Sequence, residues 1–221
     1  MLYITATPIG NLQDLSERAK RVFESSAVII AENPSHSKIL LDHLGISGKK
    51  ILQFAQHNEK RILPKILEIL KSEDAALISD AGTPAISDPG FRVVRAAIEQ
   101  GIKVVPIPGP NAAIAALSAS GLPTDKFVFL GFIPKTEIKL VRELEKIKDL
   151  EATAIFYESP HRILKTLEYI HKNWPEGKVA IARELTKIHE EFLRGTAMEI
   201  GEILKNRPSI KGEFTVLINF K

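Results

Sequence analysis

The first half of the chain alternates short apolar segments with amphipathic ones, and this alternation restricts the fold most. Apolar runs predict strands at 2–6, 27–31, 51–54, 75–79 and 103–107. Helical spacing of apolar residues and helix-ending glycines predict helices at 14–25, 35–44, 59–70 and 89–100. Strands that alternate with such helices form a mostly parallel sheet with helices on both faces. We therefore expect an α/β domain here.

The second half of the chain has a different pattern. A helix of small residues at 111–120 ends at the turn-rich segment 121–125, where we place the domain boundary. Further strands are expected at 127–132, 152–157, 179–183, 190–194 and 213–219. Further helices are expected at 137–148, 160–173 and 197–205, the second starting at Ser159 and Pro160. The short connection 186–189 suggests a hairpin, so residues 121–221 should form a second α/β domain with a mixed sheet, after a first domain at 1–120.

Composition excludes several classes of protein. The 221 residues include no cysteine, which excludes disulfides and thiolate metal sites and favours an intracellular, cytoplasmic protein. No apolar run approaches the roughly 18 residues that span a bilayer, so no membrane association is expected. The net charge of +3 is compatible with an RNA partner but weak as evidence.

One loop is too elaborate for a simple connection. Residues 79–90, of sequence SDAGTPAISDPG, hold two Gly, two Pro and two Asp directly after a predicted buried strand. Asp88 is placed as an N-cap, with Pro89 at the first helical position. Ligands of open α/β sheets bind at the carboxyl ends of strands. The loop therefore predicts a ligand site.

Two more loops resemble it, at 7–11 and 106–113, each directly after a predicted strand. Ordinary turns and tight helix–sheet packing explain either one alone, but three at one end of a sheet favour a ligand. The chain has neither G-x-G-x-x-G nor G-x-x-x-x-G-K-[ST]. A nucleotide-like ligand without a phosphate chain is therefore more plausible than ATP or NAD.

The second half carries two charged clusters at strand ends, 156–162 and 182–191. A solvated face, with Tyr157 and His161 as packing residues, is the simpler interpretation of them. The six histidines are scattered without an H-E-x-x-H motif, and there is no G-x-S-x-G elbow. No metal site and no covalent nucleophile is indicated.

Taken together, these motifs resemble a known family. The matching runs are ATPIGNL at 6–12, the segment 77–90, 106–123, FYESPHR at 156–162, ARELTKIHEE at 182–191 and KGEF at 211–214. They resemble the small-subunit ribosomal RNA cytidine-2′-O-methyltransferases, which belong to the tetrapyrrole methylase superfamily of S-adenosylmethionine (SAM) enzymes.

The resemblance implies two α/β domains with SAM in a cleft between them, a homodimer, and small-subunit ribosomal RNA or the assembled subunit as partner. The implied cofactor positions are Pro8, Ile9, Gly10, Asp80, Gly82, Thr83, Pro84, Ile86, Asn111, Ala112, Tyr157, Ala182, Arg183 and Thr215.

The implied chemistry is direct displacement at the SAM methyl by a ribose 2′-hydroxyl, which depends on in-line alignment. A base or cation near that hydroxyl would help. Candidates by residue type and location are Glu184, Arg183, Lys187 and His161. Alternatively, Arg162, Arg183 and Lys187 hold RNA phosphates.

The chain departs from the family pattern in three places. Glu32-Asn33-Pro34-Ser35 stands where the family usually reads Glu-Asp-Thr-Arg, and we expect Ser35 to take over helix capping. The family commonly has a further helical segment after the last strand, whereas this chain ends at Lys221. Segment 136–148 also has fewer adjacent basic residues than the family pattern.

These departures leave two alternatives open. One is a SAM methyltransferase of a small molecule such as a tetrapyrrole precursor, and the other is a SAM- or RNA-binding relative without catalysis. The sequence Thr7-Pro8-Ile9-Gly10-Asn11 favours RNA over the tetrapyrrole branch, which usually has a Gly-rich loop with an acidic residue there.

Overall fold

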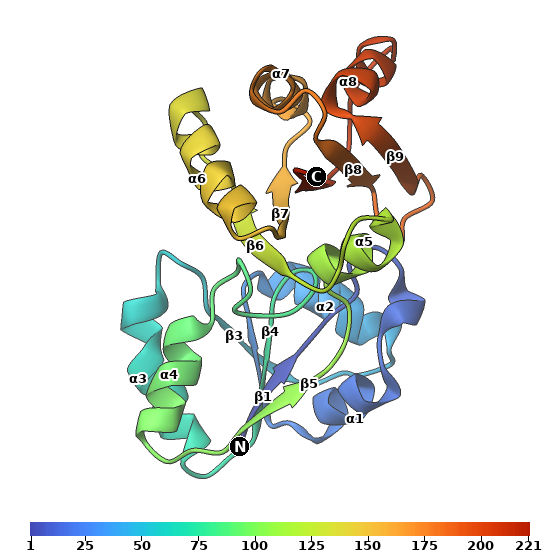
Figure 1. The fold of residues 1–221 in the computed structure, drawn as a ribbon. Coiled ribbons are helices and arrows are strands. Elements are labelled where there is room, and N and C mark those ends of the chain that lie inside the picture. The colour runs from blue at the N-terminus through green and yellow to red at the C-terminus, as the bar shows by residue number, and fades with distance from the viewer. The chain divides into compact units, whose positions relative to one another are not determined.

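The computed structural model describes all residues, Met1–Lys221. The chain forms two compact units, Met1–Asn111 and Ala112–Lys221. Each is built on its own five-stranded sheet with helices packed against it (Figure 1). None of the helices combines the length and the apolar character that crossing a membrane requires.

The first unit has a parallel sheet, as the alternation predicts. Its strands are β1 (Leu2–Thr5), β2 (Val28–Ala31), β3 (Lys50–Gln53), β4 (Ala75–Ile78) and β5 (Val104–Ile107), in the order β3-β2-β4-β1-β5. All four neighbouring pairs are parallel. Every residue of β2 and β4 is buried, which explains their unbroken apolar sequences.

Helices cover both faces of this sheet. They are α1 (Glu17–Ser25), α2 (Pro34–His43), α3 (Glu59–Leu70) and α4 (Phe91–Glu99), with the 3₁₀ helix η1 (Leu12–Asp14) before α1. Phe23 of α1 and Leu41 of α2 pack in one apolar cluster with Ile29. Ile66 of α3 and Val93 of α4 pack in a second cluster with other strand residues. The amphipathic spacing of the helices thus supplies a core on each face.

Five helices begin at other residues than the sequence predicts: α1 begins at Glu17 rather than at residue 14, α5 (Ala112–Ser120) at Ala112 rather than at 111, and three more as follows. Helix α4 has Gly90 as its N-cap, not Asp88, because Gly90 has a φ angle of 143°, outside the helical region, so the helical conformation begins only at Phe91. Helix α2 begins one residue early, with Asn33 rather than Ser35 as its cap. Helix α7 (Ile163–Asn173) begins after Arg162 instead of at Pro160.

The second unit has the predicted mixed sheet. Its strands are β6 (Phe127–Phe132), β7 (Thr153–Glu158), β8 (Lys178–Arg183), β9 (Glu191–Thr196) and β10 (Phe214–Asn219), in the order β6-β7-β10-β8-β9. Strands β6 and β7 are parallel and the other pairs are antiparallel. Strands β8 and β9 form the predicted hairpin. The last strand of the chain, β10, occupies the centre of the sheet.

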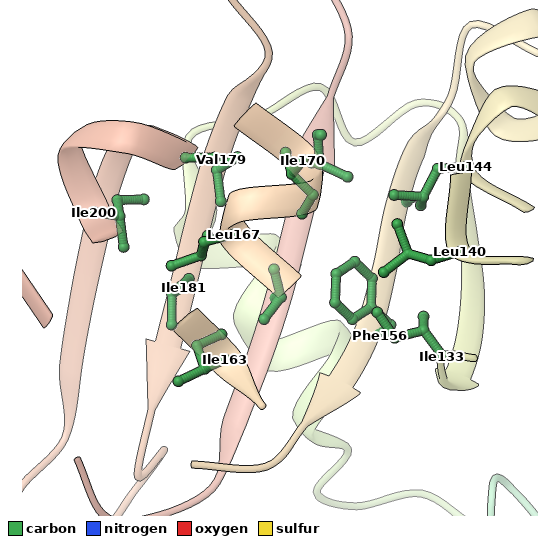
Figure 2. Close-up of a cluster of buried hydrophobic side chains, with 14 of the residues drawn as sticks. Ile133, Leu140, Leu144, Phe156, Ile163, Leu167, Ile170, Val179, Ile181 and Ile200 are labelled. Carbon is green, nitrogen blue, oxygen red and sulfur yellow. The ribbon is translucent and has the colours of Figure 1, made fainter. Parts of the chain in front are cut away.

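Helices α6 (Glu137–Asp149), α7 and α8 (Ala197–Lys205) cover one face of this sheet over a large apolar core. Figure 2 shows Leu140 and Leu144 of α6 and Ile163 and Leu167 of α7 directed toward strand residues such as Phe156. Helix α5 (Ala112–Ser120) packs against β7, β8 and β10 instead.

Helix α5 therefore belongs to the second unit, whereas the sequence-based boundary falls at its other end. The contact is reinforced at its last turn by Arg194 of β9, which donates hydrogen bonds to the carbonyl oxygens of Ala119 (2.6 Å) and Ser120 (3.1 Å). A guanidinium at this position satisfies carbonyls that a helix C-terminus leaves unpaired, and it faces the negative end of the helix dipole.

Replacing this guanidinium should loosen α5. We expect Arg194→Ala to lower the free energy of unfolding by about 1–2 kcal/mol in urea titrations, because it removes two charge-assisted hydrogen bonds. Arg194→Lys should recover only part of this, since one ammonium cannot reproduce the two-pronged contact. The control Arg95→Ala removes only an exposed pair with Glu99 and should change stability by about 0.5 kcal/mol or less. Equal destabilisation in the two alanine variants would contradict a stabilising role of Arg194 at the end of α5.

Candidate functional site

Three loops of the first unit meet at the carboxyl end of its sheet. They follow β4, β1 and β5, which are neighbours in the sheet. Thr7 and Gly82 form a two-way backbone bridge, with N–H···O distances of 2.9 and 3.0 Å. The Thr83 hydroxyl donates to the carbonyl oxygen of Pro110 at 3.1 Å. The structure thus brings together the three loops that the sequence singles out.

Small residues make this close approach possible. A Cβ atom on Gly109 would lie 2.9 Å from the Cβ of Ala6, closer than real Cβ atoms come. The loops after β1 and β5 therefore touch through backbone and methyl groups, and any larger side chain would push them apart. Gly109 and Ala6 thus have a packing role, whatever else the loops do.

The loop after β4 is also strained. Ala85 and Ser87 have φ angles of 68° and 66°, a left-handed conformation that non-glycine residues seldom adopt. Such strain persists only where the surroundings enforce it, and it clusters at binding and catalytic sites. The conformation of residues 79–90 is thus less favourable in free energy than that of an ordinary strand–helix connection.

Asp80 lies in this loop with an unsatisfied carboxylate. Its Oδ1 atom is buried and has no hydrogen-bond partner. Buried polar atoms in folded proteins nearly always have one, so a bound molecule with a donor group would supply what the chain does not. Beside it lies a hollow of about 80 Å³, bordered by Thr7, Pro8, His36 and Ser79 among other residues. This volume admits part of a nucleoside-sized ligand, not a whole one.

Acidic side chains gather around Asp80. Burial raises the pKa of Glu32, which directly follows β2, and the charges of Asp88 and Asp80 raise it further. Burial also raises the pKa of Asp88, to which Asp80 adds while a hydrogen bond from Ser79 opposes. The carboxyl ends of β2 and β4 therefore carry a negative potential that favours a cationic ligand group.

In the second unit, the FYESPHR motif forms a buried ion-pair network. The Glu158 side chain is fully buried and accepts hydrogen bonds from the Ser159 amide (2.7 Å) and the Thr166 hydroxyl (2.8 Å). Arg162 Nη2 lies 3.2 Å from Glu158 Oε2 and donates to the carbonyl oxygens of Ile133 and Pro134. Arg162 thus fixes the loop after β6.

The RELTK motif forms a second network at the end of β8. Lys187 bridges the carboxylates of Glu184 and Glu213, each at 2.9 Å. Arg183 donates to the carbonyl oxygen of Lys211 at 2.7 Å and lies 3.6 Å from Glu191. Glu191 also pairs with Arg207. The connection between β8 and β9 is therefore held by charge pairs.

These pairs fix the protonation states. Burial alone would raise the pKa of Glu184, but the hydrogen bonds from Lys187 and the Glu213 amide, with the nearby positive charges, lower it overall. Burial alone would lower the pKa of Lys187, but its bonds to Glu213 and Glu184 raise it overall. Glu184 stays ionised and Lys187 stays protonated at neutral pH. His161 is exposed, with no hydrogen bond or ion pair.

Three of the positions implied for the cofactor form a row across the second sheet. Thr215 of the central strand β10 pairs with Tyr157 of β7 on one side and with Ala182 of β8 on the other. Residues paired in register share one face of a sheet. Arg183 is the next residue along β8, so its side chain starts on the opposite face.

Sequence comparison identifies the family. The family profile of the tetrapyrrole (corrin/porphyrin) methylases matches residues 1–201. The chain belongs to this family.

Two relatives of this tetrapyrrole methylase carry the name ribosomal RNA small subunit methyltransferase I. The protein from Halalkalibacterium halodurans is 45% identical over 98% of this chain and 75% of its own length. The protein from a Hydrogenobaculum species is 46% identical over 99% of this chain and 95% of its own length.

Solved structures confirm the predicted fold class. Diphthine synthase superposes with a TM-score of 0.75 at 13% identity, over 99% of this chain and 89% of that one. Cobalt precorrin-4 methyltransferase superposes with a TM-score of 0.70 at 16% identity, over 98% and 93%. At these identities the likeness concerns the fold alone.

The segment that departs from the family's usual sequence has a structural role in this methylase. The Asn33 side chain accepts from the Ser35 amide at 3.2 Å, and Pro34 occupies the first helical position of α2. These residues start the helix well without a Thr or an Arg. Glu32, which sequence reasoning did not include among the cofactor positions, belongs to the acidic group. Its place directly after β2, a neighbour of β4, was the available signal.

The raised pKa of Glu32 makes stability depend on pH. The folded state binds this proton more tightly than the unfolded state, so stability falls as pH rises through the interval between the two pKa values. We expect Glu32→Gln to raise the melting temperature at pH 8 and to have little effect below about pH 4. Glu73→Gln, at an exposed site outside the group, should do neither. If Glu32→Gln raised the melting temperature as much at pH 4 as at pH 8, ionisation of Glu32 would not be the cause.

Proposed function

We propose that the protein transfers the methyl group of SAM to the ribose 2′-hydroxyl of a cytidine in small-subunit ribosomal RNA. The supporting observation is the 45–46% identity, over nearly the whole chain, with proteins named ribosomal RNA small subunit methyltransferase I. The structural neighbours share only the fold, so they do not favour a tetrapyrrole precursor as substrate.

The residues of the first unit fit this cofactor. The unpartnered Oδ1 of Asp80 would accept a hydrogen bond from its amino or hydroxyl groups, and the acidic surroundings suit its positive charge. We propose that the cofactor also contacts the remaining positions that the resemblance implies in this unit: Pro8, Ile9, Gly10, Gly82, Thr83, Pro84, Ile86 and Asn111. Ala112, Tyr157, Ala182, Arg183 and Thr215 are proposed for the second unit.

The cofactor supplies a methyl group already activated by its sulfonium, so the task left to the protein is mainly alignment. Among the side chains predicted as catalytic, Glu184 has a lowered pKa and Lys187 a raised one, which makes both poor proton acceptors. Arg183 is engaged by Lys211 and Glu191. We therefore propose His161, whose ring has no partner, as the first acceptor to test for the hydroxyl proton.

We further propose that the protein acts as a homodimer in the cytoplasm. The dimer follows from the family resemblance, and the location follows from the ribosomal substrate.

Label transfer tests the proposed function. Purified protein, methyl-labelled SAM and small ribosomal subunits from cells lacking this protein should give label at a single ribose 2′-oxygen, mapped by nuclease digestion and mass spectrometry. Subunits from cells that contain the protein are the matched control and should accept little label. Binding of SAM without transfer to RNA would contradict the proposal and leave a non-catalytic relative or another acceptor.

A second prediction concerns Asp80. We expect Asp80→Asn to weaken SAM binding about 10-fold or more in calorimetry, because the acceptor loses its charge, while the melting temperature of the free protein changes little or rises. Asp14→Asn, at an exposed site in η1, is the control and should bind SAM as the wild type does. Unchanged affinity in Asp80→Asn would exclude this carboxylate as a cofactor contact.

A further inference from the structure

Strand β6 carries a bulge that changes the direction of Phe132. Val128 and Leu130 point to the face covered by α6–α8 and pack against the core there. Regular alternation would send Phe132 to the same face. Instead, β6 advances three residues between Phe129 and Phe132 while its partner β7 advances two. The extra residue returns Phe132 to the face of Phe129.

Gly131 makes this bulge possible. Its φ angle is 62°, in the left-handed region that glycine adopts at little cost. Bulges of this kind redirect a side chain and are frequent beside functional sites. Strand β6 is also the edge strand of its sheet, so one side of the bulge has no neighbouring strand.

The redirected ring is fixed on one side and open on the other. Tyr157 packs edge-on against Phe129 (centroids 5.0 Å apart, 65°) and against Phe132 (5.7 Å, 66°). Phe132 nevertheless remains 67% exposed. A local structure that orients an aromatic ring and leaves it in water is costly unless something stacks on it.

Unpaired cations follow Phe132 in the chain. Lys146 and Lys148 of α6 are neutralised by Glu143 and Glu145. The other basic residues of this segment have no ion-pair partner: Lys135, Lys139 and Arg142. Lys139 and Arg142 are three residues apart and therefore share one side of α6. An oriented aromatic ring, followed within ten residues of the chain by free cations, suits a polyanion that carries flat rings.

We propose that Phe132 stacks on a base of a single-stranded segment of the RNA substrate, and that Lys135, Lys139 and Arg142 bind the phosphates beside it. Such segments are recognised through stacking on aromatic side chains and through backbone charge. A second copy of this chain is the other conceivable cover, and the oligomeric state of the Phe132→Ala variant tests it. This inference rests on the proposed function and adds to it how the substrate is held.

The proposed stacking of Phe132 on a base can be tested by the kinetics of methyl transfer to small ribosomal subunits. Phe132→Ala should raise the KM for subunits about 5- to 100-fold, as expected when one base no longer stacks, and leave kcat at saturating SAM near wild type. Phe132→Tyr should keep the wild-type KM. Phe132→Leu keeps apolar bulk without a π face, so it should behave as alanine does. Ile98→Ala, another exposed apolar residue, should have no effect.

The proposed phosphate contacts of the three cations can be tested by the salt dependence of the affinity for small ribosomal subunits. Arg142→Ala, and likewise Lys139→Ala and Lys135→Ala, should reduce the slope of log affinity against log salt concentration by about 0.7 for each phosphate that is no longer neutralised. Lys146→Ala on the same helix is the matched control and should leave the slope unchanged, because its charge is already paired. An equal reduction of the slope in Lys146→Ala would overturn this part of the proposal.

The outcomes separate the inference from the function. If the wild type transfers no methyl group to RNA, both fall. If the wild type does so and Phe132→Ala stays within about twofold of its KM, only the inference falls. Leucine acting as well as phenylalanine would overturn stacking, and disappearance of an oligomer in Phe132→Ala, measured by light scattering, would assign the ring to a second copy. Circular dichroism and melting temperature establish that each variant is folded.

Discussion

The direct backbone contact among three loops is the constraint on which the candidate site depends. The bridge between Thr7 and Gly82 joins the loops after β1 and β4, and the bond from Thr83 to Pro110 adds the loop after β5. Only very small groups fit where Gly109 meets Ala6. This explains why glycine and alanine occur where the loops after β1 and β5 meet.

The first unit combines these unfavourable features with an ordinary core. Ala85 and Ser87 are strained, Asp80 has an unsatisfied oxygen, and the pKa values of Glu32 and Asp88 are raised mainly by burial. All of them lie at one end of the sheet, while apolar clusters on both of its faces stabilise the rest. Features that cost stability and are confined to one place are typical of a binding site.

The sequence predicts the strands and helices well because the spacing of apolar residues shows which faces of an element are buried. The apolar residues of β2 and β4 are continuous because both faces of these strands are buried. In α1 and α4, apolar residues recur at helical spacing because one face of each helix packs against the sheet. The networks are less predictable, because their acceptors leave no trace in the sequence. Arg162 binds the carbonyl oxygens of Ile133 and Pro134, and any residue types would offer those oxygens. The sequence also suggests a helix cap for Asp88, whereas α4 begins after Gly90, and it groups α5 with the unit that precedes it.

The position of β10 in the second sheet has a consequence for how this unit is assembled. The strand lies between β7 and β8 and is hydrogen-bonded to both, although it is made of residues 214–219. Until that segment arrives, β6–β7 and β8–β9 are separate ribbons with open edges, and two-stranded ribbons are barely stable in water. During synthesis, the second unit must therefore wait for nearly its whole length to leave the ribosome before its sheet can close, whereas the sheet of the first unit is complete about half a chain earlier.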